Sequence, residues 1–396
     1  MKKDILLLSN AYYPSIGGIE NSLRHLAEEA KNNNDNVKII VSDISVPRDY
    51  PKKAIEEIDG VIVQRYQIAP LKNVFGKFLN LILSNYTLFK LLKSEFEKNS
   101  DTVVIARFHF AALLATKVGF KNVRYVVPSI VRNQLKAEST NTVVSKLVLK
   151  AKVFLHDIIQ RKALRVCKNF VFSQSMLSQC KALANNTDSD YQITKPGVDE
   201  RRFFPLCIAD KQPQIDLLDL DSSKPIILFI GRFVKAKGAD LLIQALAKVP
   251  DCQLLMVGEG EENQKYLELV ANLGLGDRVK IFPPTKEVEK FYKLADIFAM
   301  TSNYEPLGQT ILEALSSGLP LIAFKKSSEV DTATQELDID EFVSYAENYT
   351  VNELIIAMEA AVNKLQTINP QIIHQVAIEK FSWLNLYKTL TNSNSN

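Results

Sequence analysis

The chain has 396 residues, of which 46% are hydrophobic and 23% charged, so a disordered or fibrous protein is excluded and two globular domains are expected. Its four cysteines include no C-x-x-C pair, which favours reduced thiols in the cytoplasm, and its four isolated histidines argue against a zinc cluster. No apolar run is long enough to span a bilayer, and the first ten residues predict a buried strand rather than a signal peptide.

Charge is spread unevenly along the chain. The formal net charge is +3, but residues 1–200 hold 29 Lys and Arg against 19 Asp and Glu, which gives +10. Subtraction from the totals of 48 and 45 leaves 19 and 26 for residues 201–396, which gives −7. A basic first half and an acidic second half indicate different partners for the two.

In the first half, short apolar and β-branched runs alternate with helical stretches. This is the pattern of a parallel sheet with helices on both faces. The runs that predict strands are 4–9, 37–41, 61–66, 102–106, 123–127 and 169–172.

Two adjacent glycines, Gly17 and Gly18, lie in the loop after the first strand, and helical residues follow from about Ile19 to Ala30. Such a pair lets the backbone approach a ligand closely at a strand-to-helix turn, although a plain tight turn needs the same residues. Arg107 and His109 directly follow the strand 102–106. They would project from the sheet edge into an interdomain cleft, but an isolated histidine can equally be structural.

The helical stretches 71–98 and 143–164 are amphipathic and basic. Between Lys117 and Lys168 there are 12 Lys and Arg against two acids, Glu138 and Asp157. Such helices can lie on an anionic membrane surface, or they can be core helices with a solvated basic face, and both interpretations stay open.

The second half repeats the alternation after a polar stretch, 205–224, which we interpret as a linker. The strands are predicted at 226–230, 254–257, 279–282, 297–300 and 321–324, and helices dominate from 352 to about 390, before a tail expected to be disordered. The fold class is therefore α/β with two doubly wound, Rossmann-like domains.

The loop after the first of these strands carries Arg232 and Lys237, in the segment G-R-F-V-K-A-K-G. A guanidinium fork and an ammonium suit a diphosphate, although two surface cations would give the same pattern. The nearby Gly258-x-Gly260-x-x-Asn263 lacks the third glycine of a dinucleotide fingerprint and follows the second strand, so a nicotinamide oxidoreductase is disfavoured.

The stretch S-N-Y-E-P-L-G-Q-T-I-L-E-A-L-S-S-G-L-P, residues 302–320, is the most informative segment. Glu305 lies in a loop, Gly308 allows a tight turn, and a helix is predicted from Gln309 to Ser317. The first backbone N–H groups of that helix, at Gln309 and Thr310, would form an anion site, and Glu313 would face the same crevice to accept from sugar hydroxyls. The alternative is a capped helix with two solvated glutamates.

Taken together, these segments and the P-G-V-D of Pro196–Asp199 resemble the retaining glycosyltransferases of the GT-B fold, family four, over nearly the whole chain. The resemblance implies two domains facing a cleft: residues 1–204, completed by a C-terminal helix at about 378–391 that contains Trp383, and residues 205–377. Arg107 stands where the family often has a histidine, and Pro283-Pro284 replaces a more common glycine-containing turn.

The resemblance also implies a role for each site residue. Arg232 and Lys237 would neutralise the donor diphosphate, Glu313 would bind the ribose, and His109 would lie beside the reacting sugar and acceptor. Glu305 would contact the transferred sugar without being a covalent nucleophile. The remaining donor-binding residues implied are Gly17, Gly18, Thr285, Leu307, Gly308, Gln309 and Thr310.

The expected activity is transfer of a sugar, with retention, from a UDP- or GDP-linked donor to a hydroxyl of a glycan or lipid-linked acceptor. No metal, cofactor or nucleic acid is expected. The setting implied is bacterial surface-polysaccharide synthesis in the cytoplasm, with the protein possibly peripheral at the inner face of the plasma membrane. Two alternatives stay open: a GT-B nucleotide-sugar epimerase or hydrolase, and a non-catalytic basic membrane-binding protein.

Overall fold

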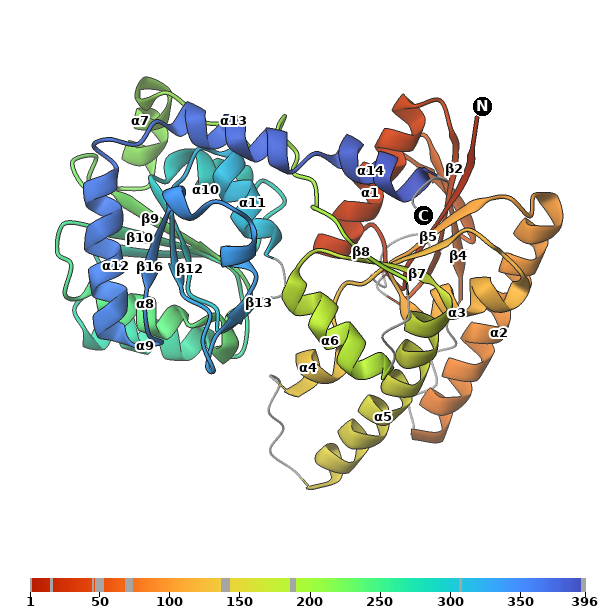
Figure 1. Cartoon of the computed structure of the whole chain (residues 1–396). Coiled ribbons are helices and arrows are strands. Elements are labelled where there is room, and N and C mark those ends of the chain that lie inside the picture. The colour runs from red at the N-terminus through yellow and green to blue at the C-terminus, as the bar shows by residue number, and fades with distance from the viewer. Residues whose placement is uncertain are drawn as a thin grey trace. The chain divides into compact units, whose positions relative to one another are not determined.

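The computed structural model describes residues 2–14, 17–44, 46, 53–67, 74–136, 143–185, 190–305 and 308–392. The chain forms two compact units (Figure 1). The first contains Met1–Thr194 and Trp383–Asn396, and the second contains Lys195–Ser382. Each unit is built on its own sheet.

In its described residues the first unit has one sheet with the strand order β3-β4-β2-β1-β5-β6-β7-β8. Neighbouring strands are parallel except for the antiparallel pair β3–β4. The strands are β1 (Asp4–Leu8), β2 (Asn36–Ser42), β3 (Ile55–Ile58), β4 (Val61–Tyr66), β5 (Val103–Ala106), β6 (Val123–Val126), β7 (Lys168–Val171) and β8 (Tyr191–Ile193). The two that the sequence pattern does not predict, β3 and β8, are short edge strands with exposed or half-buried side chains.

Helices cover this sheet because their apolar faces need a partner. Side chains of α2, α3, α5 and α6 form one core with β1, β2 and β5. Helix α1 packs on β1 and β2, and α14 packs on α1. The helices are α1 (Gly18–Asn32), α2 (Val74–Lys98), α3 (His109–Val118), α4 (Val131–Lys136), α5 (Val143–Val166), α6 (Gln174–Ala184) and α14 (Trp383–Thr391). Trp383 stacks on His25 at 4.9 Å, and the Tyr387 hydroxyl donates to Asp35 at 2.5 Å, so the C-terminal helix is part of the first unit.

The second unit has a sheet of the order β11-β10-β9-β12-β14-β16 in its described residues, with every neighbouring pair parallel. Its strands are β9 (Ile226–Ile230), β10 (Gln253–Val257), β11 (Val279–Phe282), β12 (Ile297–Met300), β14 (Leu321–Phe324) and β16 (Val343–Ala346). A separate parallel pair joins β13 (Tyr304–Glu305) to β15 (Asp331–Thr332), so Glu305 lies on a short strand instead of an irregular loop. Strands β13, β15 and β16 are not predicted from the sequence.

Both faces of the second sheet are buried. Ile226 and Leu228 of β9 face a core formed with α10, α11 and α13, and Ile227 and Phe229 face a core formed with α8, α9 and α12. This period of two explains why the strands read as continuous apolar runs. The helices are α7 (Ile208–Leu217), α8 (Ala239–Leu246), α9 (Asn263–Asn272), α10 (Glu289–Leu294), α11 (Gln309–Ser316), α12 (Val351–Lys364) and α13 (Pro370–Lys380). The predicted doubly wound α/β fold is confirmed.

The segment 205–224 is not an irregular linker, and that prediction is wrong. It contains α7, and its residues Ile215 and Leu220 are buried in the core of the second unit, so hydrophobic burial orders it. Val198 and Phe203 belong to the same core, so the compact units divide after Thr194, whereas the predicted domain boundary lies after residue 204. Among the described residues, no helix has the length and apolar character needed to cross a membrane.

Candidate active site

Each sheet has one place where the strand order reverses direction. In the second unit it lies between β9 and β12, and in the first unit it lies between β1 and β5. Ligands of doubly wound sheets bind beyond the carboxyl ends of the strands at such a switch point, because the loops there diverge and leave a crevice. The predicted site residues lie mostly on these loops.

In the second unit, an ion pair between the Lys237 ammonium and Glu305 Oε2 joins the loop after β9 to β13, which follows β12. The two side chains are only 22% and 14% exposed. The same loops are also joined by the Thr301 hydroxyl, which donates to the Lys237 carbonyl at 2.8 Å, and by the Asn303 N–H, which donates to Ala236 at 3.0 Å. The structure therefore brings together two residues that lie 68 positions apart.

Glycines hold the loop that carries Arg232. The Gly231 N–H donates to Val257 at 3.1 Å and the Phe233 N–H to Glu259 at 2.8 Å, so the loops after β9 and β10 lie backbone to backbone. A Cβ on Gly258 would overlap the Gly231 carbonyl oxygen. Close packing of these two loops thus accounts for the glycines of Gly258-x-Gly260. The Arg232 side chain is exposed at the sheet edge.

Helix α11 begins where the sequence predicts. Gly308 is its N-cap and supplies no side-chain cap, so the first N–H groups, including those of Gln309 and Thr310, remain directed out of the helix start. The Gln309 amide donates to the Gly197 carbonyl at 2.8 Å, which ties P-G-V-D to this helix. Gly318, which follows the end of this helix, has φ +77°, and Leu307 lies outside the described residues.

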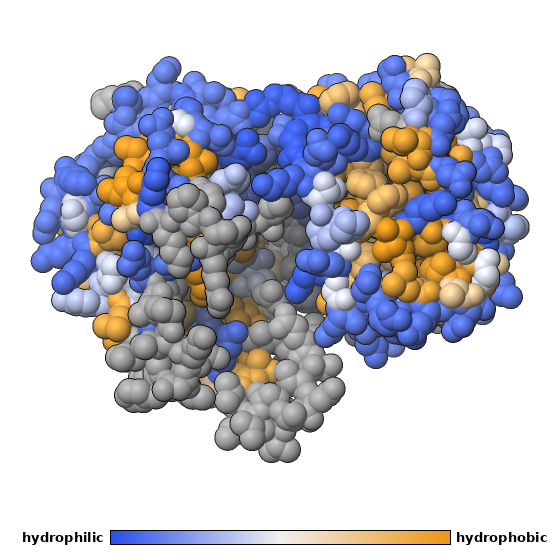
Figure 2. All heavy atoms as spheres, turned by 180° about the vertical axis from the view of Figure 1, so that it is seen from behind, coloured by the Kyte–Doolittle hydropathy of each residue, from blue (hydrophilic) through white to orange (hydrophobic). Residues whose placement is uncertain are grey.

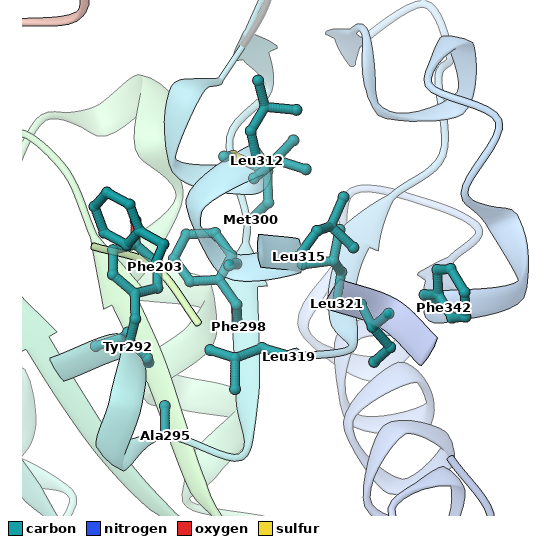
Figure 3. Close-up of a cluster of buried hydrophobic side chains, with 14 of the residues drawn as sticks. Phe203, Tyr292, Ala295, Phe298, Met300, Leu312, Leu315, Leu319, Leu321 and Phe342 are labelled. Atoms are coloured by element: carbon teal, nitrogen blue, oxygen red, sulfur yellow. The ribbon is translucent and has the colours of Figure 1, made fainter. Parts of the chain in front are cut away.

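Glu313 is 8% exposed, and its Oε2 accepts from the Tyr292 hydroxyl at 2.9 Å. Figure 3 shows the apolar cluster to which Tyr292 belongs, with the rings of Phe203 and Phe298 beside it. Burial raises the pKa of Glu313 from 4.5 to about 7, against the lowering effect of the Tyr292 hydroxyl. The sequence predicted Glu313 but not Tyr292, although a buried tyrosine hydroxyl requires a partner.

Thr285 follows β11 and is half-buried, and its hydroxyl accepts from the Glu287 N–H at 3.2 Å. A pocket of about 700 Å³ lies at the same sheet edge. It is lined by Gly258, Glu259, Gly260, Asn263, Leu267, Ile281, Phe282 and Pro283. Its volume falls in the usual range of small-molecule sites.

The remaining predicted residues belong to the first unit. Gly17 is the N-cap of α1, in extended backbone, and a Cβ on Gly18 would meet open space. His109 is the first residue of α3, is 4% exposed and shares a 2.9 Å hydrogen bond, Nε2 to Nδ1, with His156 of α5. Burial and His156 lower the pKa of His109 to about 3, so its imidazole is neutral at physiological pH.

The structure thus gathers the predicted donor residues of the second unit that it describes, all but Leu307, at one sheet edge, and it holds Gly17, Gly18 and His109 at the corresponding edge of the first unit. His156 was missed by the sequence analysis, since it lies within the amphipathic pattern of α5. In the described part of the chain, no three His, Cys, Asp or Glu side chains form a group suited to a metal ion.

Comparison with known proteins gives a consistent result. The family Glycosyl transferases group 1 matches residues 210–344. The lipopolysaccharide core biosynthesis glycosyltransferase LpsE of Rhizobium meliloti is 36% identical over 106 residues, which are 27% of this chain and 31% of that protein. This chain spans about a third of the length of the curated relatives it matches.

Two solved structures illustrate the similarity of fold. Sucrose-phosphate synthase from Thermosynechococcus elongatus aligns with a TM-score of 0.77 at 19% identity, over 98% of this chain and 97% of that one. Anabaena Alr3699/HepE in complex with UDP-glucose aligns with a TM-score of 0.69 at 17% identity, over 98% of both chains. The predicted GT-B fold is confirmed by this agreement.

Proposed function

We propose that the chain transfers a sugar, with retention, from a nucleoside diphosphate sugar to an acceptor hydroxyl, and the match of the family Glycosyl transferases group 1 to residues 210–344 supports this. The observation that carries the proposal is the set of groups at the switch point between β9 and β12. There, Lys237 pairs with Glu305, Arg232 extends from the adjoining loop, and α11 directs its first backbone N–H groups outward. This set suits a ligand that carries both phosphates and hydroxyls.

In this proposal the donor diphosphate binds Arg232, Lys237 and the N–H groups at Gln309 and Thr310, with Gly308 allowing close approach. Lys237 has three N–H donors and gives one to Glu305, so two can reach phosphate oxygens. Glu313 accepts from the ribose hydroxyls in its ionised form. The base lies toward Thr285, beside the pocket lined by Pro283 and Phe282. Leu307, Gly17 and Gly18 keep the donor roles that the family resemblance implies.

The reaction exchanges one bond for another. The acceptor oxygen forms a bond to the anomeric carbon on the face from which the phosphate leaves, the bond between that carbon and the phosphate oxygen breaks, and the acceptor proton passes to the departing phosphate. Charge develops on the leaving oxygen, where Arg232, Lys237 and the α11 dipole stabilise it. Glu305 orients the sugar hydroxyls, and neutral His109 lies beside the sugar and acceptor.

The acceptor in this proposal is a glycan or a lipid-linked glycan, and the setting is surface-polysaccharide synthesis at the cytoplasmic face of the membrane. LpsE, named for lipopolysaccharide core biosynthesis, supports that setting. Helix α2 exposes Ile82, Leu83 and Tyr86 near Lys90. Helix α5 exposes Phe154 near Lys150 and Lys152. Exposed apolar groups beside lysines suit an anionic interface.

Apolar exposure alone does not single out these helices. Figure 2 shows separate apolar groups on a largely hydrophilic face, and other exposed apolar residues include Leu217 and Ile356 of the second unit. The membrane proposal therefore depends on the lysines. Flotation with anionic and with neutral vesicles tests it, and equal binding to both, or to neither, would contradict it.

The activity is tested first by calorimetry and thermal shift against UDP, GDP, ADP and their sugars without added metal. Binding of one nucleotide supports the donor site and identifies the base, whereas no binding by any of them rejects it. Product analysis with and without acceptor then separates transfer from hydrolysis or epimerisation. Full transferase activity in Arg232→Ala would contradict the role assigned to Arg232.

A further inference from the structure

Arg107 occupies the switch point of the first sheet and has no part in the donor site proposed above. It directly follows β5, and its backbone N–H donates to the Leu8 carbonyl of the neighbouring β1 at 2.8 Å. Its side chain therefore lies where the loops after β1 and β5 diverge, the position at which such sheets bind ligands.

Two nitrogens of the buried Arg107 guanidinium lack an acceptor in the described part of the chain. The residue is 7% exposed, and neither Nε nor Nη1 has a hydrogen-bond partner among the described residues. The group lies over the Phe172 ring at 5.4 Å. Burial lowers its pKa to about 10, partly offset by Tyr125 and Glu20, so it remains charged at neutral pH. A buried charge of this kind destabilises the protein unless an anion compensates it.

A second buried arginine of the same unit differs because a carboxylate compensates its charge. Arg65 is 4% exposed, its Nε donates to Glu56 at 2.5 Å and its Nη2 donates to the Tyr13 carbonyl, although its Nη1 also lacks a partner among the described residues. Glu20, the carboxylate near Arg107, does not accept from its Nε or Nη1 in the described structure. Instead, the Glu20 Oε2 lies 2.5 Å from where a Cβ on Gly17 would be, so this side chain folds back over the start of α1.

The surroundings of Arg107 add positive potential. Helix α1 has 15 residues, and its N-cap Gly17 offers no side-chain acceptor for the first N–H groups. These groups carry the positive end of the helix dipole. In addition, the first half of the chain has an excess of ten positive charges. The Glu20 carboxylate in the first turn of α1 offsets part of this potential, but it leaves the Arg107 Nε and Nη1 without acceptors in the described structure, so a negatively charged group on a ligand would still be favoured at this edge.

We propose that Arg107 binds an oxyanion, a phosphate or carboxylate group, carried by the acceptor substrate. The inference rests on the proposed function, because it assumes that an acceptor approaches the first unit near His109. The donor diphosphate has its own cations, Arg232 and Lys237, on the other unit. Arg107 therefore selects acceptors that carry a negative charge near the reacting hydroxyl.

The first test uses inorganic phosphate and acetate as probes, with the donor site filled by whichever nucleoside diphosphate the screen selects. In wild type, each probe that fits raises the melting temperature above that in chloride of equal ionic strength. In Arg107→Met this rise is lost, and Arg107→Lys retains part of it. Without probe, Arg107→Met melts at or above the wild-type temperature, because it removes an uncompensated charge.

Arg65→Met is the matched control. It removes the ion-pair partner of Glu56, whose side chain is only 10% exposed, so it lowers the melting temperature in every buffer while keeping the response to phosphate. The proposal is overturned if Arg107→Met lowers stability equally in all buffers, if it responds to the probes like wild type, or if it loses nucleotide binding. The last result would assign Arg107 to the donor.

The second test compares transfer to hexose 1-phosphates, uronic acids and the matching methyl glycosides. We expect wild type to prefer one charged class, and Arg107→Met to lose about tenfold or more in kcat/KM for that class alone. An equal loss for charged and neutral acceptors would overturn the inference. Absence of nucleotide binding in wild type would instead reject the proposed function, so the two failures are distinguishable.

Discussion

The two units place cations at equivalent points of similar sheets but treat them differently. At the switch point between β9 and β12, Lys237 is paired with Glu305, and nearby Glu313 accepts from Tyr292. At the switch point between β1 and β5, Arg107 is more deeply buried, and its Nε and Nη1 lack acceptors in the described structure. In the second unit the Lys237 charge is compensated by Glu305. In the first unit the Arg107 charge is available to an anionic group of a ligand.

The difference has a physical consequence. A charge that is already paired is held in position before the ligand arrives, and a ligand gains only the difference between its contacts and those it replaces. An unpaired buried charge lowers the stability of the free protein but gives a matching anion most of its interaction energy. The sheet edge that carries Lys237 and Glu305 is therefore preorganised for the donor. The edge that carries Arg107 is selective for acceptors with a negative charge. Variants of the residues at the donor edge test this difference.

The largest effect is expected at the glycines. Gly258→Ala places a Cβ onto the Gly231 carbonyl oxygen, at a residue with φ +156°, so the loops after β9 and β10 must separate. We expect roughly 3 kcal/mol or more of destabilisation and loss of nucleotide binding, measured by urea unfolding and calorimetry. Gly18→Ala is the control from the first unit, because its Cβ meets open space, and it should unfold like wild type. Equal unfolding of both variants would contradict the close packing of these loops.

The next effect concerns pH. The pKa of Glu313 is raised by burial from 4.5 to about 7, so the unfolded chain releases this proton at lower pH than the folded one. The contribution of the protonated carboxyl to stability is therefore complete below about pH 4.5 and is lost as pH rises through about 7. The shift corresponds to about 3 kcal/mol at most.

Unfolding of wild type and Glu313→Gln between pH 5 and 8 checks this prediction. The variant cannot ionise at this position. Its free energy of unfolding should therefore increase relative to that of wild type up to about pH 7, and the difference should then level off. Nucleotide affinity of wild type should rise over the same range, because only the carboxylate accepts two ribose hydroxyls. A difference that does not depend on pH would show that Glu313 is ionised throughout.

The smallest effect on stability is expected at the ion pair. Lys237→Met and Glu305→Gln each leave one largely buried partner uncompensated, so the double variant should be less destabilised than the sum of the singles, by about 1–2 kcal/mol. Glu305→Gln should also lose about 10- to 100-fold in kcat/KM, since it weakens a charged contact to the sugar. If the destabilisations of the two single variants add up in the double variant, the ion pair does not contribute as proposed. If Glu305→Gln keeps full activity, Glu305 does not contact the sugar as proposed.

The sequence predicted the parts of the fold that depend on local pattern. Apolar runs such as 226–230 and 297–300 bury both of their faces, so they appear as strands without any alternation to interpret. The loop of Gly231–Gly238 and the stretch around Glu305 and Glu313 were recognisable because their residue types suit one ligand. The segment 205–224 was misread, because its polar composition concealed Ile215 and Leu220, whose burial depends on partners far along the chain.

The α/β alternation, the glycine-bearing loops and the identity of the charged residues at the strand ends could thus be predicted from local sequence. Whether each of those charges is paired, and how deeply it is buried, depends on the folded arrangement. Lys237 meets Glu305 across 68 residues, His109 meets His156 across 47, and Arg107 meets no acceptor for its Nε and Nη1 in the described residues. Pairing and desolvation depend on which side chains the fold brings within a few ångströms, and no local pattern records that.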